Sequence, residues 1–377
     1  MDNGFKTRIQ YIEPDKDRRI IAVSDIHGND GYLKGVLEQA GYSEQDILVI
    51  VGDMIEKGKE SLKTIRTILN LRKENPDVHA LMGNVEHFQL RIFNENGPDA
   101  CREFIGGLRW RKEIWGRSFF LDILEELGIC LADLCDDNIS DVKKRIRENY
   151  REELDFLQTL PTIIAMGNFI FVHGGIPTDS IEELQGTDAF PYLKWDEFMN
   201  RDVQFQKTVV VGHWPVCLYR EDVYCMNPRF DDKKHIIGID GGCSLNIGAQ
   251  LNALLIPHAW ADMKDISYTA YDDFPRIVAG YAQNAEKGAV EIRYADSIIT
   301  PLEEKDGIVR AVHAGSGKSF YMPKEWLYQS GDEWHCDNYS AAKLGVTEGD
   351  VLSVIREYPM GKFVKKDGVL GWYCPKG

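Results

Sequence analysis

Five short polar motifs follow five apolar, β-branched runs, and each motif begins close to the end of its run. The runs have the length and composition of buried strands; they span residues 20–23, 47–51, 78–82, 169–172 and 208–211. The motifs are Asp25-Ile26-His27-Gly28, Gly52-Asp53, Gly83-Asn84, His173-Gly174-Gly175 and Gly212-His213. In open α/β sheets, ligands bind beyond the carboxyl ends of the strands. We therefore expect the five motifs to meet at one place.

The side chains of these motifs are typical metal ligands. They comprise three histidines, two aspartates and one asparagine, a set that suits a pair of hard to borderline divalent metals. Asp25 and His27 are two residues apart, so both can face one metal from an extended chain. Asp53 can bridge two cations with its two oxygens, although a lone Asp at this point could equally be a turn residue. Two metals that share a carboxylate indicate hydrolytic phosphate chemistry.

Strands and helices alternate along the first part of the chain. Helical spacing of apolar residues over 31–40 and 60–72 separates the first three strands, which predicts a largely parallel sheet covered by helices. Residues 88–160 break this alternation and are predicted to form a helical insertion over the strand tips. A packing subdomain and a specificity cap are equally good interpretations of it. The closer strand spacing after residue 163 predicts a more antiparallel sheet.

The character of the chain changes again near residue 280. Short strands between Gly, Asp and Lys turns predict a small all-β domain over 280–377, of unknown role, after a catalytic domain over 1–275. Gly315-Ser316-Gly317-Lys318-Ser319 looks like the end of a P-loop, but Val312 occupies the position of the motif's first glycine. Because no strand–loop–helix context surrounds this segment, we interpret it as a hairpin turn.

Composition limits the partners and the compartment. The net charge is −16 and no basic stripe is visible, so duplex nucleic acid is a poor candidate for a partner. No apolar stretch has the length needed to span a bilayer. The eight cysteines form no CxxC pair, and the first residues carry no apolar signal region. We expect a cytoplasmic protein with free thiols and no membrane contact; the oligomeric state is open.

The motif order D-x-H-G, G-D-x-x-x-x-G, G-N-x-E, H-G-G and G-H resembles that of the calcineurin-like metallophosphoesterases. Within them the chain looks most like the phosphoprotein-phosphatase (PPP) branch and its bacterial members. Residues 235–243 and 248–251 resemble the strand pair that closes that domain, so the resemblance covers roughly residues 18–270. It implies an α/β fold, a two-sheet sandwich flanked by helices (αββα), with the insertion and the C-terminal all-β domain added.

The resemblance also implies a centre of two divalent or trivalent metal ions, Mn, Fe or Zn. One metal would be held by Asp25, His27 and Asp53. The other would be held by Asp53, Asn84, His173 and His213. A water or hydroxide that bridges the two metals would then attack phosphorus.

Three positions depart from the PPP pattern. Lys57 replaces an arginine that would hold phosphate with two nitrogens, and a lysine offers only a point charge. Val85 replaces the general-acid histidine and cannot donate a proton, while Glu56 stands where that acid's partner carboxylate would be. His87 is a candidate substitute acid if its side chain points back to the centre. Besides Lys57, Asn84 and Trp214 are candidate substrate contacts; Trp214 directly follows His213.

Three functions follow from this pattern. The first is a metal-dependent phosphoesterase that hydrolyses a phosphomonoester, with phosphoproteins among the candidate substrates. The second is a nucleotide phosphoanhydride hydrolase of the diadenosine-tetraphosphatase kind, whose good leaving group needs little help from an acid. The third is a catalytically weak or inactive binding module on the same scaffold, which Val85 favours. The phosphorylated substrate is thus expected to be a phosphoprotein or a nucleotide.

Overall fold

The computed structural model describes residues 5–15 and 17–375, which form two compact units. Unit 1 consists of the described residues within Met1–Pro215, Pro228–Leu245 and Leu251–Tyr271. Unit 2 consists of the described residues within Val216–Asn227, Asn246–Gln250 and Asp272–Gly377. Unit 2 therefore takes two short segments from within residues 1–275, the range predicted for the catalytic domain.

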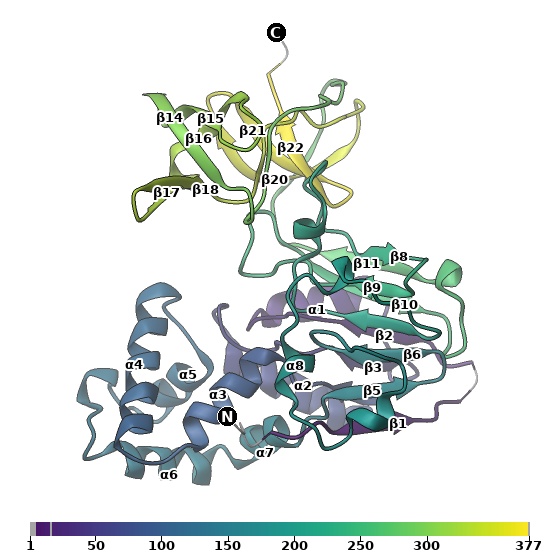
Figure 1. The fold of residues 1–377 in the computed structure, drawn as a ribbon, viewed down its shortest axis with the longest axis vertical. Helices are drawn as coiled ribbons and strands as arrows, with labels where there is room; N and C mark the ends of the chain where they lie inside the picture. Colours follow the sequence, from purple (N-terminus) through teal and green to yellow (C-terminus); the bar gives the residue numbers. More distant parts are fainter. Residues whose placement is uncertain (1–4, 16, 376–377) are drawn as a thin grey trace. The chain divides into compact units, whose positions relative to one another are not determined.

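Unit 1 is built on two β-sheets (Figure 1). The six-stranded sheet has the order β1 (Ile9–Ile12), β5 (Ile163–Met166), β6 (Phe169–Val172), β7 (Thr208–Val211), β9 (Ile236–Gly238) and β8 (Arg229–Asp231). The five-stranded sheet has the order β11 (Ser267–Tyr271), β10 (Leu251–Ile256), β2 (Ile20–Val23), β3 (Ile47–Ile50) and β4 (Val78–Ala80). This is the predicted two-sheet sandwich.

Strand pairing brings the ends of the predicted strands to the same edges. β2, β3 and β4 are parallel neighbours, as predicted, and β6 and β7 are parallel neighbours in the other sheet. The carboxyl ends of β2 and β3 therefore lie side by side, and so do those of β6 and β7. Antiparallel pairs occur later in the chain, at β5–β6, β8–β9 and β10–β11. The second half of unit 1 is thus mixed, since β7 and β9 are parallel.

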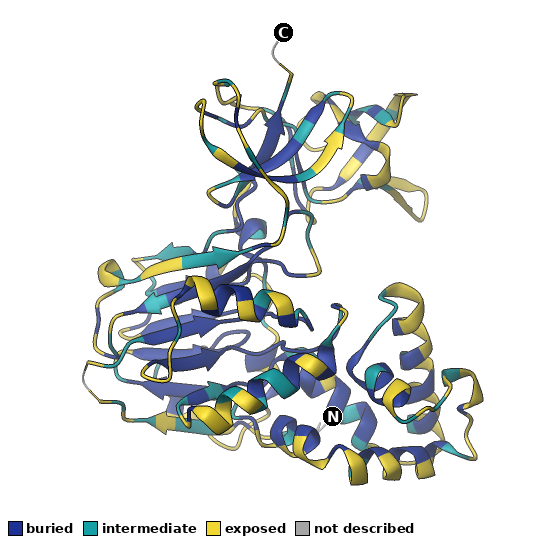
Figure 2. Cartoon of the chain, turned by 180° about the vertical axis from the view of Figure 1, so that it is seen from behind, coloured by how far each residue is buried: buried dark blue, intermediate teal, exposed yellow. Residues whose placement is uncertain are grey.

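The strands of unit 1 are buried on both faces, which explains their continuous apolar runs. Along β2, Ile20 and Ala22 belong to the core between the two sheets, whereas Ile21 and Val23 belong to the core beneath the helices. This alternation follows from the two-residue period of a strand. Figure 2 shows the strands of unit 1 as mostly buried and its helices as buried on one side and exposed on the other.

Eight α-helices lie in the described part of unit 1. They are α1 (Asp30–Gln39), α2 (Ser61–Glu74), α3 (Asn84–Asn94), α4 (Pro98–Ile114), α5 (Phe119–Glu126), α6 (Ile139–Asn149), α7 (Arg151–Thr159) and α8 (Phe190–Leu193). The predicted insertion corresponds to α3–α7, the helices between β4 and β5. Short 3-10 helices are η1 (Leu131–Asp133), η2 (Ile181–Leu184), η3 (Phe198–Asn200) and η5 (Met263–Asp265).

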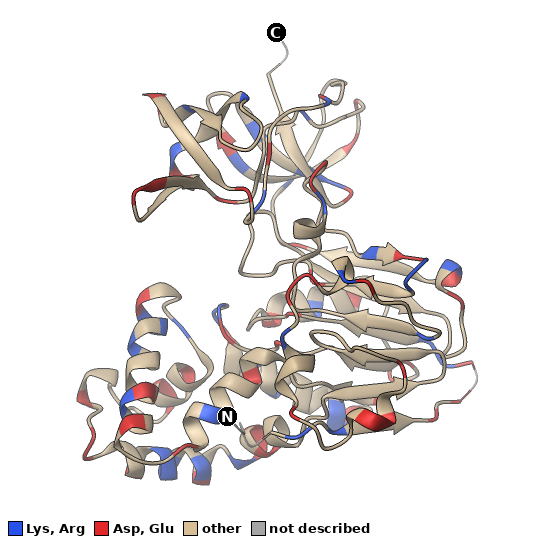
Figure 3. Cartoon of the chain, viewed as in Figure 1, with Lys and Arg blue, Asp and Glu red and all other residues tan. Residues whose placement is uncertain are grey.

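Local chemistry sets the bounds of the insertion helices. Pro98 opens α4, where its missing N–H costs nothing. Ser118 caps α5 because its Oγ accepts a hydrogen bond from the Leu121 N–H at 3.2 Å. Figure 3 shows segments of both charges interleaved along these helices, so neither sign dominates their exposed face in that view.

Unit 2 is rich in β-strands, as predicted. Its sheets are β12–β20–β21–β22, β16–β15–β14–β18–β17 and the pair β13–β19. The strands are β12 (Arg276–Val278), β13 (Glu291–Ile292), β14 (Ile298–Lys305), β15 (Ile308–His313), β16 (Ser319–Pro323), β17 (Leu327–Ser330), β18 (Glu333–Cys336), β19 (Tyr339–Ser340), β20 (Val351–Tyr358), β21 (Gly361–Lys366) and β22 (Val369–Tyr373), with η4 (Val216–Tyr219) and η6 (Lys324–Trp326).

Aromatic side chains form the core of unit 2. Trp326, Tyr339, Phe363 and Trp372 are buried and pack with ring centres 5.0 to 6.3 Å apart. The P-loop-like segment connects β15 and β16, which pair antiparallel, and this confirms the predicted hairpin turn.

None of the eight cysteines forms a disulfide bond in the described structure. Among the residues that the structure describes, no helix is both long enough and apolar enough to cross a membrane.

Candidate functional site

The loops after β2 and β3 bring three acidic or imidazole side chains together. Asp25, His27 and Asp53 are buried, and each offers one ligand atom such that all three atoms lie within 4.8 Å of one another. The three residues have positive φ angles of 56°, 48° and 49°. Non-glycine residues adopt this left-handed conformation at an energetic cost, and it concentrates at functional sites.

A second group shares Asp53 with the first. His173, at the end of β6, places its Nε2 3.3 Å from Asp53 Oδ1 and 3.1 Å from Asn84 Oδ1. Asn84 is the first residue of α3. The ring of His213, which follows β7 and also has a positive φ, lies 5.4 Å from that of His173. The structure thus brings together all six side chains predicted as metal ligands.

Each of the three histidines has one ring nitrogen engaged outside the cluster. Nδ1 of His173 lies 2.7 Å from the Val51 carbonyl oxygen, and Nδ1 of His27 lies 3.3 Å from the carbonyl oxygen of Ile55. Nε2 of His213 lies 2.7 Å from a carboxylate oxygen of Asp196. Metal-binding histidines characteristically donate their other N–H to such acceptors. The nitrogen left for a cation is Nε2 in His27 and His173, and Nδ1 in His213.

The charge state of the cluster suits a cation. Burial and the neighbouring Lys57 lower the pKa of His27 to about 3, so its ring is neutral at pH 7, as a metal ligand must be. Burial alone would raise the pKa of Asp53, but the charge and hydrogen bond of His173, together with His27 and Lys57, outweigh burial and lower it. Oδ1 of Asp25 is buried and makes no hydrogen bond in the described structure. A buried carboxylate oxygen without a partner is costly, and a bound cation would satisfy it.

His173 has the opposite shift. Burial lowers its pKa, but the nearby carboxylates of Asp53 and Asp25 outweigh burial and raise it to about 10. In the metal-free chain, a protonated His173 therefore partly neutralises the two aspartates. A metal ion between the same carboxylates would supply that positive charge instead.

Glu86 organises the loops around the cluster, a role that the motif pattern did not reveal. Its two side-chain oxygens accept hydrogen bonds of 2.8 to 3.2 Å from four backbone N–H groups, those of Asp53, Met54, Ile55 and Gly83. It thereby joins the loop after β3 to the start of α3. The sequence signal was the glutamate of G-N-x-E, but only the fold shows what it contacts.

Two glycines allow the loops to approach this closely. A Cβ at Gly52 would lie 2.7 Å from Nδ1 of His173, and one at Gly83 would collide with the backbone and carboxylate of Asp53. Gly52 also has a φ of 81°, in the left-handed region. The glycines of the Gly52-Asp53 and Gly83-Asn84 motifs are therefore required by packing as well as by backbone conformation.

Glu56 forms a buried ion pair with Arg111 of α4. Nε of Arg111 lies 2.8 Å from Oε2 of Glu56, and the two side chains are 6% and 1% exposed. The other oxygen of Glu56 accepts the Phe119 N–H at 2.9 Å. Burial raises the pKa of Glu56 to about 7, and Arg111 opposes that rise. An arginine from the insertion is therefore the partner of the carboxylate that would serve the family's general acid.

Two further residues predicted to contact the substrate, Lys57 and Trp214, lie next to the cluster. Nζ of Lys57 lies 3.0 Å from Nε2 of His27, so its charge is next to the predicted metal ligands. Trp214 is half-buried, its ring centre lies 6.5 Å from that of His213, and its Nε1 makes no hydrogen bond in the described structure.

The side chain of His87 contacts aromatic rings. Its ring centre lies 4.8 Å from that of Phe5 and 5.6 Å from that of Phe190. It is buried, and burial lowers its pKa. Nε2 makes no hydrogen bond in the described structure. The general-acid role of His87 stays a prediction, and these contacts give it no support.

Asp240 is a buried carboxyl group near the cluster that sequence reasoning left without a role. One of its oxygens accepts the Gly242 N–H at 2.7 Å, and the other has no hydrogen-bond partner in the described structure. Burial, reinforced by the charge of Asp25, raises its pKa well above the ordinary value. Its only sequence signal was its place in the segment that resembles the closing strand pair.

Unit 1 also has an apolar cavity beside the cluster, which we name the α3–α4 pocket. It has a volume of about 530 Å³ and is lined by Glu56, Asn84, Val85, Phe88, Gln89, Ile92, Glu103, Gly106, Gly107, Trp110, Arg111 and Trp115. Asn84 belongs both to this wall and to the predicted ligands.

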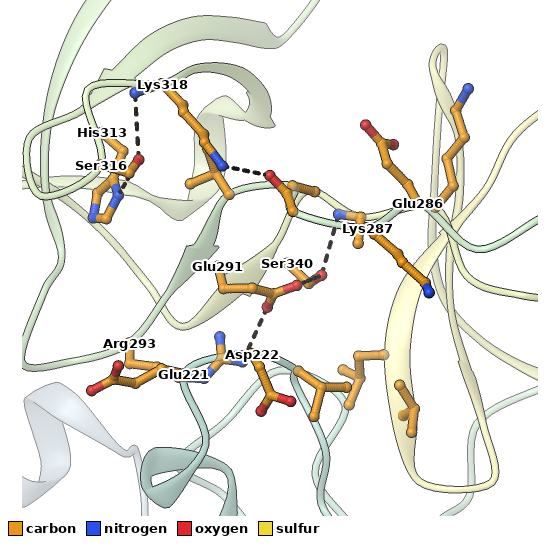
Figure 4. Close-up of a pocket in the computed structure, with 18 of the residues that line it drawn as sticks. Glu221, Asp222, Glu286, Lys287, Glu291, Arg293, His313, Ser316, Lys318 and Ser340 are labelled. Carbon is orange, nitrogen blue, oxygen red and sulfur yellow. Dashed lines mark hydrogen bonds and ion pairs between the residues drawn. The ribbon is translucent and has the colours of Figure 1, made fainter.

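A second cavity, of about 680 Å³, lies within unit 2 (Figure 4). Ser316 Oγ lies 3.0 Å from Nδ1 of His313 and accepts the Lys318 N–H at 3.4 Å. Deeper in the cavity, Glu291 and Arg293 form an ion pair at 3.0 Å. Because acidic and basic groups line this cavity together and these polar groups engage one another, it favours no particular charge on a ligand.

Comparison with known proteins gives matches to phosphatases. The chain is 38% identical over 88 residues to serine/threonine-protein phosphatase 2 of Escherichia coli (strain K12), which covers 23% of this chain and 38% of that protein. It is 34% identical over 105 residues to the Salmonella typhimurium protein of the same name, which covers 27% and 45%. The chain thus spans less than half the length of these curated relatives. The matches confirm the resemblance to the bacterial PPP branch.

A solved structure of a protein serine/threonine phosphatase from Saccharomyces cerevisiae, with similarity to human phosphatase PP5, matches with a TM-score of 0.45 and 12% identity, over 72% of this chain and 85% of that chain. That likeness is too weak to support an argument about function. The family model for calcineurin-like phosphoesterases matches residues 18–232, more than half of the 377 residues. The chain therefore belongs to the calcineurin-like phosphoesterase family.

Proposed function

We propose that this chain is a metal-dependent phosphatase that hydrolyses a phosphomonoester, with phosphoproteins among its candidate substrates. The observation that carries the proposal is the arrangement of the three histidines. Each has one ring nitrogen engaged by a carbonyl or carboxylate oxygen outside the cluster, and Nε2 of His27 and His173 faces buried carboxylates. Structural histidines have no need of such an arrangement, whereas metal ligands do.

The donor set divides into two groups that share Asp53. Asp25, His27 and Asp53 would hold one cation; Asp53, Asn84, His173 and His213 would hold the other. Oxygen and imidazole nitrogen donors of this kind suit Mn, Fe or Zn. When bound, the two cations would activate water for attack on phosphorus and offset the charge of the phosphoryl oxygens.

The residues around the donors would bind and orient the substrate. The ammonium group of Lys57 is already beside His27, where it would attract the phosphoryl oxygens. Asn84 is the first residue of α3, so its amide group and the N-terminus of this helix would both attract an anion. Glu56, fixed by Arg111 and by the Phe119 N–H, would orient groups at the pocket side of the centre. Trp214, whose Nε1 has no hydrogen-bond partner among the described residues, would border the substrate.

Metal analysis and hydrolysis on one sample test the proposal. Purified protein is stripped with a chelator, reloaded with Mn, Zn or Fe, and analysed for metal content, and hydrolysis of phosphomonoesters is measured with and without each metal. We expect about two metals per chain and hydrolysis that the chelator abolishes. Failure of every metal to bind would refute the proposal. Bound metal without hydrolysis of any phosphate compound would favour a binding module.

A phosphoanhydride hydrolase is the second candidate, and Val85 is the observation that favours it. Phosphate leaving groups need less protonation than alcohols do, so a site without the family's histidine acid is better suited to them. Parallel assays with dinucleoside polyphosphates and with phosphopeptides distinguish the two candidates. A higher kcat/KM for the dinucleoside polyphosphates would select the anhydride hydrolase.

A further inference from the structure

We propose that the α3–α4 pocket binds the leaving group of the substrate and that this group is an aromatic ring joined to phosphorus through oxygen. The preferred substrate would thus be an aryl phosphomonoester. This inference rests on the proposed function, because it places the pocket beside the phosphoryl group. Beyond that function, the inference specifies the chemical class of the leaving group.

The position of the pocket supports the assignment. Its wall includes Asn84, whose Oδ1 lies 3.1 Å from Nε2 of His173, so the pocket begins at the predicted metal ligands. Val85 and Glu56 are the next residues of the wall. They occupy the positions of the family's general acid and its partner, and an acid acts on the leaving group. The pocket therefore lies on the side from which the leaving group departs.

The lining of the pocket is aromatic. Phe88 of α3, Trp110 of α4 and Trp115 after α4 face it, and Trp110 and Phe88 are 49% and 41% exposed. Exposed aromatic side chains that share one cavity indicate a binding site rather than core packing. A cavity of about 150 Å³ can bind benzene, so a pocket of about 530 Å³ has room for a substituted ring.

Arg111 contributes a polar group to the pocket wall, and its positive charge is paired with Glu56. Its guanidinium carbon lies 5.5, 5.9 and 6.0 Å from the ring centres of Phe88, Trp110 and Trp115, and its charge is balanced by Glu56. A guanidinium plane in such surroundings stacks well on an aromatic ring. It would not attract a second anion as strongly as an unpaired arginine would.

The chemistry of the leaving group agrees with the missing acid. In the hydrolysis, a water oxygen forms the new bond to phosphorus, the bond between phosphorus and the aryl oxygen breaks, and its electron pair leaves on that oxygen. A phenol has a pKa of about 10, so the phenolate can depart without a proton and take one from solvent afterwards. An aliphatic alkoxide is far more basic and would need the donor that Val85 cannot provide.

The test separates ring recognition from leaving-group acidity. The kcat/KM for phenyl phosphate is compared with that for hexafluoroisopropyl phosphate, whose leaving group has similar acidity but no ring. Wild type is compared with Trp110→Ala, which opens the pocket, and with Gly106→Leu, which fills it. A Cβ at Gly106 meets no atom within 4 Å, so the leucine fits the helix. Ile114→Ala is the matched control, because Ile114 is exposed on α4 but does not line the pocket.

We expect both pocket variants to lower the ratio of phenyl to hexafluoroisopropyl kcat/KM by about tenfold, with the ratio unchanged in Ile114→Ala. An unchanged ratio in both pocket variants, with hydrolysis intact, would overturn the pocket assignment and leave the proposed function standing. Free phosphotyrosine and a phosphotyrosine peptide then distinguish the source of the ring. A higher kcat/KM for the peptide identifies a protein substrate, and the reverse identifies a small aryl phosphate.

Binding of 4-fluorophenol, followed by ¹⁹F NMR on the metal-free chain, tests the pocket without any turnover. Binding that Gly106→Leu abolishes and Ile114→Ala preserves supports the pocket even if the phosphatase proposal fails. Absence of binding to wild type would overturn the inference.

Discussion

Replacing Arg111 by Met should make the folded chain progressively less stable as the pH rises above neutrality. The substitution removes the guanidinium from Glu56 and leaves an apolar chain in its place. Both side chains are almost fully buried and their charged atoms are 2.8 Å apart. Removing one partner of such a pair leaves a buried charge without compensation, unless that charge is neutralised by a proton.

The magnitude follows from proton linkage. Burial raises the pKa of Glu56 to about 7 in the folded chain, above its value in the unfolded chain. The stability linked to its proton is therefore fully present below the unfolded-state pKa and is lost as the pH rises to about 7. Without Arg111 the folded chain keeps this proton to a higher pH. The variant then holds one proton more than wild type. Its unfolding free energy should fall relative to wild type by about 1.4 kcal/mol for each pH unit above 7.

Below about pH 6 both folded forms hold the proton. The difference should then shrink to the loss of the hydrogen bond that Arg111 donates to the Gly107 carbonyl oxygen, about 1 kcal/mol. The assay is urea unfolding of metal-free protein between about pH 5.5 and 8.5, followed by tryptophan fluorescence, since Trp110 and Trp115 lie next to the pair.

The control is the same substitution in a Glu56→Gln background, which lacks the titrating group. There the effect of Arg111→Met should be independent of pH. A difference between the single variant and wild type that stays flat from pH 6 to about 8.5 would refute the reasoning, because it would mean that Arg111 does not control the proton of Glu56.

Other substitutions test the cluster itself. Asp53→Asn should weaken metal binding and lower chelator-sensitive hydrolysis by more than about 100-fold, as elemental analysis and rate assays would show; full metal content with full activity would contradict the shared-ligand assignment. Val85→His should speed the hydrolysis of alkyl phosphates by up to about 10²-fold and aryl phosphates much less, so equal effects on both would argue against a missing acid. Glu86→Gln should destabilise unit 1 by about 2–3 kcal/mol in urea unfolding, because an amide cannot accept all four backbone hydrogen bonds; an unchanged midpoint would be the contrary result. His87→Leu should leave kcat within about twofold, because the ring packs between two phenylalanines; a loss of about 10²-fold or more would restore His87 as the acid.

The predictable parts of the fold are the elements whose residue pattern is visible within one short segment of the sequence. β2 and β3 are buried on both faces, so each is a continuous apolar run that the sequence displays directly. β8 and β14 carry no such run, because they are edge or half-exposed strands with charged residues, and local composition does not separate such strands from loops. Within the predicted helical insertion, residues 139–159 are divided into α6 and α7 at Tyr150, a break without Gly or Pro to mark it.

The candidate site likewise combines residues that local sequence identifies with contacts that only tertiary packing creates. Asp25, His27 and Asp53 could be named because each lies at the end of a recognisable strand. The partnership of Glu56 with Arg111 could not, because the two residues are joined only by the packing of α4 against the loop after β3. Which side chains of α3 reach the pocket depends likewise on the three-dimensional fold, because it is set by the side of the helix that faces α4. Val85, Phe88, Gln89 and Ile92 share the pocket-facing side of α3, and His87 falls outside that set, which its distance from Asn84 along the chain could not reveal.

The left-handed backbone at the predicted metal site has a consequence for engineering this protein. Asp25, His27, Asp53, Lys57 and His213 all have φ between 48° and 66°, a conformation that glycine adopts without penalty. Each of them therefore holds a predicted site side chain at a position where a glycine would make the folded chain more stable. Selection for heat tolerance alone would tend to erode this centre, whereas selection for turnover would preserve it. If the proposed hydrolysis uses these side chains, thermal stability and turnover place opposite demands on these loops, and variants selected for one of them should lose the other.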